Sequence, residues 1–231
     1  SVVNALSSIL KVDIYKDGKV YRQEYSKGKV KSKVKIEKCS KKMKGTEISF
    51  LPDETIFDVT TYDPKKLYSF INMKSVLVGG TTIEFKIDKE LINDKTPNKK
   101  DFYFKNGIED YFKLEYSKKN RLFEKDFFLK NKLNQNENFE VYITFNKSES
   151  SSLKSFCNTI ETPDGGSHEI GVKNGLIKAI KLYGQKNQIF KINNINQNDL
   201  IDYSYIIISI FINEPSFEGQ TKKRIIMPKL Q

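Results

Sequence analysis

Apolar and polar residues alternate over much of the chain, a pattern typical of strands with one covered face. Two alternating runs within residues 11–30 flank Lys16-Asp17-Gly18-Lys19, where the Asp-Gly pair predicts a hairpin turn. Similar runs predict further strands in the rest of the chain, at residues 29–38, 45–53, 81–88, 139–147, 152–162 and 203–214.

Apolar residues recur at helical spacing in three other segments. Residues 1–10 predict an amphipathic helix with one buried stripe, and residues 63–77 predict a helix entered through Asp63-Pro64. Residues 167–184 predict a third helix, and the segment 117–139 is rich in Lys and Asn and is expected to be partly loop. The pattern changes register near Gly107, which predicts two domains, 1–108 and 109–231, of the α+β class.

The composition is that of an ordinary soluble globular protein, with 38% hydrophobic and 30% charged residues in 231. No run approaches the roughly 18 apolar residues that would span a bilayer, and no charged-then-apolar leader opens the chain. Two cysteines and a single histidine are too few for a disulfide scaffold or a zinc site. We therefore expect a cytoplasmic protein without membrane contact.

The formal net charge of +11 comes almost entirely from lysine. This excess suits a partner that carries phosphates, either a nucleotide or a nucleic acid. It also suits a composition biased jointly toward Lys, Asn and Ile. The lysine-dense run 27–44 has two interpretations: a phosphate-binding strip, or an edge strand protected from aggregation by charge. The lack of interleaved aromatic residues favours the second.

The segment "ETPDGGSHEIG" combines a turn with a helix start. Gly165-Gly166 offers two positions that tolerate positive φ, and Ser167 is expected to cap the following helix. His168 is the only histidine. It could donate a proton or contact a phosphate, or it could simply hydrogen-bond the turn, and the second interpretation is favoured.

Two further motifs, taken singly, are only weak indications of ligand binding. Gly45-Thr46 opens a strand where the backbone can approach a flat ligand and the hydroxyl can bond it. In "FEGQTKK", Gly219 permits a sharp exit from the preceding apolar strand, Gln220 offers an amide and Lys222 a mobile charge suited to a phosphate. Without other knowledge this last motif indicates an exposed turn.

Together these segments carry a resemblance. The collinear series "SVVNALS", "DGKVYRQEYSKG", "GTEISFLPD", "FCNTIETPDGGSHEIG" and "INEPSFEGQTKKR" resembles the ATPase region of the type IIA DNA topoisomerases, found in the B subunits of DNA gyrase and topoisomerase IV. The fourth and fifth motifs look closer to topoisomerase IV. The resemblance implies that residues 1–108 are the C-terminal portion of a GHKL ATP-binding domain. Residues 109–231 would form a transducer domain with a left-handed βαβ unit.

The resemblance also implies roles for individual residues. Ser1 would lie at the start of a helix facing the triphosphate of ATP, and Thr46 would help hold adenine. Gln220 and Lys222 would reach the γ-phosphate as binding and catalytic groups. The hydrolytic carboxylate, the Mg²⁺ ligand and the dimer arm would lie in a family segment upstream of Ser1.

On this basis the chain would serve ATP-driven passage of one DNA duplex through another. Its partners would be DNA, a topoisomerase A subunit and a second copy of its own parent protein. The chain by itself is predicted neither to hydrolyse ATP nor to dimerise strongly. The alternatives are a non-catalytic nucleic-acid-binding module of similar fold, or another GHKL ATPase such as a mismatch-repair protein or a chaperone.

Overall fold

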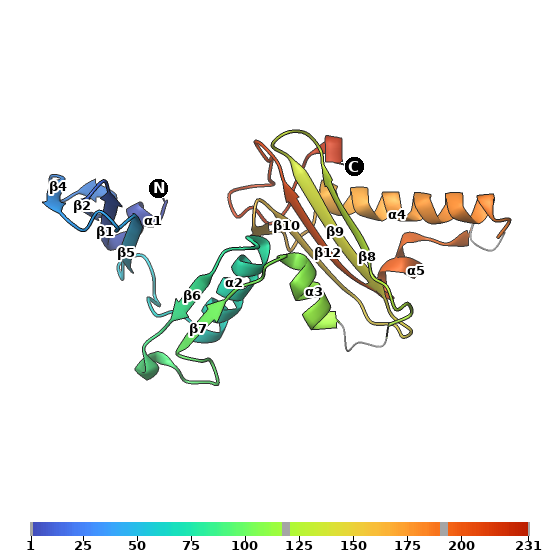
Figure 1. Ribbon diagram of the computed structural model, residues 1–231, viewed down its shortest axis with the longest axis horizontal. Coiled ribbons are helices and arrows are strands. Elements are labelled where there is room, and N and C mark those ends of the chain that lie inside the picture. The colour runs from blue at the N-terminus through green and yellow to red at the C-terminus, as the bar shows by residue number, and fades with distance from the viewer. Residues whose placement is uncertain (1, 117–120, 190–193, 231) are drawn as a thin grey trace. The chain divides into compact units, whose positions relative to one another are not determined.

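The computed structural model describes residues 2–116, 121–189 and 194–230, and the chain divides into two compact units, Ser1–Asp63 and Pro64–Gln231. Each unit contains a five-stranded sheet (Figure 1). Within the described ranges, no helix has the length and apolarity that crossing a bilayer requires.

The first unit is an antiparallel sheet in the order β3-β2-β1-β5, with β4 also paired to β2. The predicted hairpin turn is confirmed, because Asp17 and Gly18 have φ of 53° and 74° between β1 and β2. The lysine-rich β3 and β4 lie at the edge beside β2. The elements are α1 Val2–Ala5, β1 Ser7–Lys16, β2 Lys19–Ser26, β3 Lys29–Val30, β4 Lys35–Lys38 and β5 Gly45–Pro52.

The amphipathic helix predicted for residues 1–10 is wrong beyond its first turn. The helix α1 covers only Val2–Ala5, and its two valines are largely exposed rather than buried. The chain then enters β1, where Leu10 pairs with Tyr25 on one side and with Phe50 on the other. Pairing with two neighbouring strands outweighs the local helical spacing, since a long-range contact overrides a weak local preference.

The second unit contains a mixed sheet in the order β11-β10-β12-β9-β8. A separate antiparallel pair, β6 and β7, precedes it in the chain. β10 and β12 are parallel and α4 lies between them in the chain, so the expected βαβ unit is present, while its left-handed sense stays a prediction. The elements are α2 Pro64–Leu77, β6 Ile83–Lys86, η1 Lys89–Leu91, β7 Lys99–Phe102, α3 Ile108–Tyr116, β8 Phe127–Lys132, β9 Asn138–Phe145, β10 Ser152–Cys157, β11 Ile160–Glu161, α4 Ser167–Lys186, α5 Gln197–Ile201, β12 Ser204–Phe211 and η3 Pro228–Leu230.

Both faces of this second sheet are covered, as Figure 1 shows. On β12, Tyr205 and Ile207 join a core with α2 and α3, whereas Ile206 and Ile208 join one with residues of α4 and α5. Successive strand residues point to opposite faces. A strand covered on both faces therefore has an uninterrupted apolar sequence, as "YIIISIF" does.

The helix α3 was not expected from the sequence, and it joins the segment from Pro64 onward to the downstream sheet. Val76 and Leu77 of α2 share a core with Phe112 of α3 and Tyr142 of β9. Packing therefore divides the chain at residues 63 and 64. The boundary between an ATP-binding portion and a transducer at 108/109 concerns evolutionary domains and stays a prediction.

Candidate functional site

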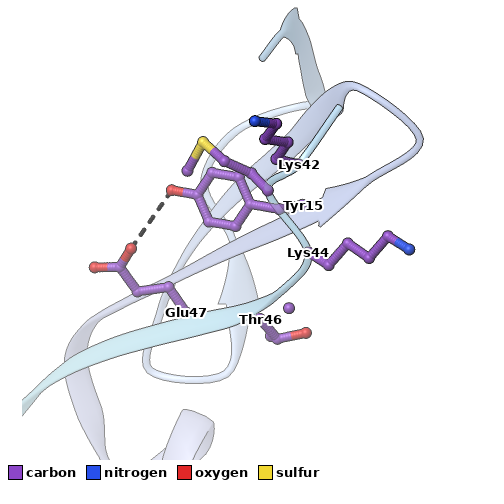
Figure 2. Close-up of a pocket in the computed structure, with 7 residues that line it drawn as sticks. Tyr15, Lys42, Lys44, Thr46 and Glu47 are labelled. Carbon is purple, nitrogen blue, oxygen red and sulfur yellow. Dashed lines mark hydrogen bonds between the residues drawn. The ribbon is translucent and has the colours of Figure 1, made fainter. Parts of the chain in front are cut away.

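Thr46 lies near the start of β5, opposite Ile14 of β1, and its side chain is exposed. It lines an open hollow of about 390 Å³ (Figure 2). The hydroxyl of Tyr15 donates to the Glu47 carboxylate across this hollow, at 3.5 Å. Lys42 and Lys44 also line it. Ser1, the other predicted binding residue of this unit, lies outside the described residues.

Gln220 and Lys222 lie together on a loop of the second unit, here called the C-terminal loop, residues 213–229. The apolar strand β12 ends at Phe211, so these residues do not continue the strand, and the expectation of a direct strand end is wrong. The loop forms a small hairpin of its own, in which Phe217 bridges Ile225 and the Glu218 N–H donates to the Arg224 carbonyl at 2.9 Å.

The tip of this hairpin is polar and exposed. Gly219 and Lys222 both have positive φ, 80° and 56°, and the Lys222 N–H donates to the Gly219 carbonyl at 3.3 Å. The Lys222 ammonium lies 5.9 Å from the centroid of the Phe217 ring. Arg224 pairs with Glu218 at 3.6 Å, whereas Lys222 has no carboxylate partner among the residues that the structure describes. Its charge is therefore available to an anionic ligand.

The Gly165-Gly166 turn anchors the base of the hairpin. The Ile225 N–H donates to the Gly165 carbonyl, and the Ser167 N–H donates to the Ile225 carbonyl, each at 3.1 Å. Both glycines have positive φ, as predicted. A Cβ on Gly166 would lie 2.4 Å from the Ile225 oxygen, so only glycine allows this approach. The Gly165-Gly166 turn and the hairpin that carries Gln220 and Lys222 are thus joined by hydrogen bonds.

Ser167 does not cap α4, contrary to expectation. Its hydroxyl oxygen accepts from the Met227 N–H at 2.8 Å, which is a further bond to the C-terminal loop. Gly166 occupies the cap position instead, without a side-chain hydrogen bond. Ser167 is itself the first helical residue and not the residue before the helix. Its hydroxyl is therefore not in the cap position and is used for the long-range contact.

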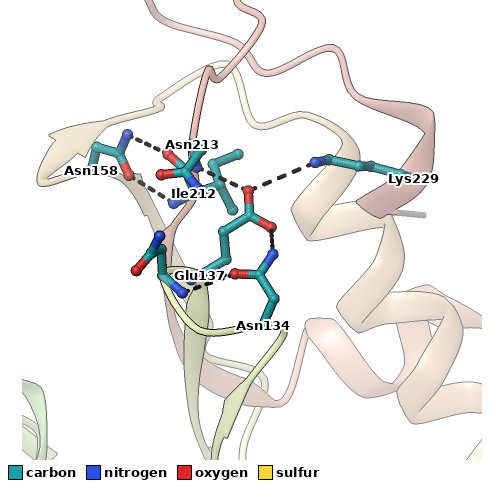
Figure 3. A network of polar contacts seen from close by, with 7 residues as sticks. Asn134, Glu137, Asn158, Ile212, Asn213 and Lys229 are labelled. Carbon is teal, nitrogen blue, oxygen red and sulfur yellow. Dashed lines mark hydrogen bonds and ion pairs between the residues drawn. The ribbon is translucent and has the colours of Figure 1, made fainter.

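Two side chains hold the start and the end of the loop (Figure 3). Asn158 accepts from the Ile212 N–H and donates to the Ile212 carbonyl, both at 2.9 Å. The buried Glu137 carboxylate accepts from the Asn213 N–H at 2.9 Å and lies 3.8 Å from the Lys229 ammonium. One carboxylate therefore contacts both ends of the C-terminal loop. Sequence reasoning missed this role because no motif near Glu137 indicates it.

His168 is 3% exposed, which favours its structural interpretation. Its Nε2 lies 3.1 Å from the Thr162 hydroxyl, which also bonds the Ser155 backbone, and the Ser155 hydroxyl donates to Glu169 at 2.6 Å. Burial lowers the pKa of His168 to about 4, so the ring is neutral near pH 7. The network adjoins the glycine turn, because the Gly165 N–H donates to the Thr162 carbonyl at 2.9 Å.

No three His, Cys, Asp or Glu side chains come together as a metal site within the described ranges. Cys39 and Cys157 are both free thiols. Burial raises the pKa of Cys157 to about 11, which keeps this thiol protonated and unreactive.

Comparisons with known proteins agree with this architecture. The sequence profile of the DNA gyrase B family matches residues 107–231. The topoisomerase 4 B subunit of Rickettsia felis is 37% identical over 98% of this chain and 34% of its own length. The DNA gyrase B subunit of Campylobacter jejuni is 37% identical over 97% and 28%, respectively. The chain thus spans about a third of the length of these curated relatives.

Solved structures give the same result. The topoisomerase IV ATP-binding domain of Francisella tularensis superposes with a TM-score of 0.80 and 29% identity, over 99% of this chain and 61% of that one. The 43K ATPase domain of Thermus thermophilus gyrase B superposes with a TM-score of 0.73 and 25% identity, over 99% and 61%. With the profile match covering more than half of the sequence, the chain belongs to the DNA gyrase B family of type II topoisomerase ATPase subunits.

Proposed function

We propose that this chain is the nucleotide-sensing and transducing part of a type II topoisomerase B subunit, of the topoisomerase IV type, and that Lys222 is its sensor. The single observation that supports this most is the anchored C-terminal loop. An exposed ammonium without a carboxylate partner among the described residues stands on a hairpin whose base is bonded to the Gly165-Gly166 turn. Such a loop presents a cation from a stiff base.

A lysine suits the terminal phosphate of ATP because it is a compact cation with three donors. If Lys222 contacts only the γ-phosphate, it binds the ATP and ADP states with different free energies. Only such a difference can shift a conformational equilibrium. Gln220, two residues away on the same tip, would add an amide donor. Thr46 and Ser1 would hold the adenine and triphosphate ends, as the family resemblance implies.

The parent protein would couple this contact to passage of one DNA duplex through another. We propose that its partners are DNA, a topoisomerase A subunit and a second copy of the parent protein. These contacts would involve segments that the longer curated relatives have in addition to this chain. Bound Mg²⁺ would neutralise phosphate charge during transfer, held by residues outside those described.

Lys222→Ala tests the proposal in a protein of the same length as the curated relatives. We expect ATP turnover to fall by at least about 100-fold, as for loss of a cation that stabilises transferred phosphate. Lys223→Ala, which removes the adjacent exposed lysine, is the matched control and should retain turnover within about twofold. Equal turnover in the two variants would exclude Lys222 as the sensor.

A further inference from the structure

The hairpin of β10 and β11 ends in a strained two-residue turn, Asn158–Thr159. Cys157 pairs with Ile160, which leaves these two residues as the loop, and their φ values are 48° and 66°. Turns with two positive φ values favour Asn followed by Gly. Asn158 suits its position, but Thr159 is β-branched and is strained there. Strain of this kind persists only where surrounding contacts over-determine it.

Lys74 of α2 supplies such a contact. Its ammonium donates to the Thr159 carbonyl and lies 3.3 Å from the Thr159 hydroxyl. The ring of Phe70 lies 5.2 Å away, and burial lowers the pKa of the lysine. Hydrogen bonds from a charged donor are about twice as strong as neutral ones. A glycine at position 159 would relieve the strain but would remove the hydroxyl that Lys74 uses.

The other residue of the turn holds the base of the C-terminal loop. Asn158 exchanges two hydrogen bonds with Ile212, the residue immediately before the loop. The Asn158 N–H also donates to the Ile210 carbonyl of β12 at 2.9 Å. Helix α2 and the loop base are therefore linked through two adjacent residues, both in an uncommon backbone conformation.

We propose that Lys74 is a positioning residue that holds the Asn158–Thr159 turn in its strained form and thereby fixes the base of the C-terminal loop. A shift of α2 that withdraws the ammonium releases the turn, and the bonds from Asn158 to Ile212 weaken with it. The functional meaning of this coupling rests on the proposed role of Gln220 and Lys222, which the loop carries. The coupling itself does not depend on nucleotide.

Amide hydrogen exchange on the 231-residue chain, without nucleotide, tests the proposal. In Lys74→Met we expect exchange of the Asn158 and Ile212 amides to accelerate by about tenfold or more, as for loss of one charge-assisted bond. The amide of Ile208, in the centre of β12, should be unchanged. Lys65→Met, on the same helix and exposed, is the control and should leave all three amides unchanged.

Thr159→Val provides a second test should Lys74→Met fail to fold. Valine keeps the β-branched shape and removes only the hydroxyl acceptor, so we expect a smaller acceleration of about threefold at the same two amides. Unchanged exchange at Asn158 and Ile212 in the folded variants overturns the proposal. Normal turnover in Lys222→Ala, by contrast, would reject the proposed function and leave this coupling intact, so the two failures are distinguishable.

Discussion

Both units contain strands in which apolar and polar residues alternate, but they bury very different numbers of apolar side chains. In the first unit, Leu10 and Val20 are the buried hydrophobic residues among those described, and Ile48 of β5 is 60% exposed. In the second unit, every residue of β12 from Ser204 to Ile210 is buried, and Ile208 is 0% exposed. Alternation thus predicts a strand, but it does not predict what covers the strand.

This difference matters for the candidate site, because the C-terminal loop is built on the well-covered sheet. Ile225 at the base of its hairpin is 1% exposed and belongs to the same core as Ile208. A loop anchored in a packed core keeps its base fixed while its tip remains solvated. The Thr46 motif lies on the poorly covered sheet, where most residues of the strand β5 are themselves exposed.

The largest expected effect compares one isoleucine from each unit. Ile208→Ala should lower the free energy of unfolding by about 4 kcal/mol, because it leaves a cavity in a closed core. Ile48→Ala should change it by less than about 0.5 kcal/mol, because the side chain is already largely hydrated. Urea unfolding monitored by amide exchange in each unit gives both values. Similar losses for the two variants would contradict the difference in burial.

The second comparison uses two glycines with similar φ values. Gly45 has φ of 128° and open space around its Cβ position, whereas Gly166, at 139°, faces the Ile225 backbone. Gly166→Ala should cost about 3 kcal/mol through strain and collision together, and Gly45→Ala about 1 kcal/mol through strain alone. The urea midpoints of the two variants measure the difference. Equal midpoints would mean that the close approach to Ile225 is absent in solution.

The third comparison concerns pH. His168 is buried in the folded protein, where its pKa is about 4. In the unfolded chain the pKa of histidine is about 6.5, so below pH 6.5 the unfolded chain binds a proton more readily than the folded protein does. Stability of the second unit therefore falls as pH drops from 6.5 toward 4, by up to about 3 kcal/mol. Asp53 behaves differently, because its bond from Lys27 lowers its pKa. The stability that ionised Asp53 contributes is complete above the ordinary pKa of an aspartate, 3.8, and is lost only as the pH falls below that value.

Between pH 6.5 and 4.5 the second unit should therefore lose stability and the first should not. Amide exchange resolved by unit measures both. His168→Gln is the matched control, since glutamine can still bond the Thr162 hydroxyl but does not titrate, and the variant should lose most of this pH dependence. A steep dependence that persists in His168→Gln would assign the effect to other groups.

The sequence predicts elements well where local chemistry decides them. The Asp17-Gly18 hairpin and the helix after Gly166 depend on turn residues that few other conformations accept. The helix α3 was missed although Ile108, Tyr111, Phe112 and Tyr116 recur at helical spacing, because its aromatic residues also suit a strand. The helix predicted for residues 1–10 fails for a related reason, since strand partners distant in sequence determine its structure.

The candidate site is predictable only in part. Residue chemistry alone indicated an exposed turn at Gln220 and Lys222, and exposure is what the fold gives them. The close approach of Gly166 to Ile225, and the roles of Glu137 and Asn158, could not be inferred, because each is a contact between segments far apart in sequence. Buried polar groups acquire their partners from tertiary structure, so composition gives no sign of them.

The most direct measurement of the central claim is the ratio of affinities for a non-hydrolysable ATP analogue and for ADP, in a protein of the same length as the curated relatives. If Lys222 senses the γ-phosphate, Lys222→Ala should reduce this ratio by at least about tenfold while ADP affinity stays within about twofold. Lys223→Ala should leave the ratio unchanged. An unchanged ratio in Lys222→Ala, or an equal loss of affinity for both nucleotides, would contradict the account.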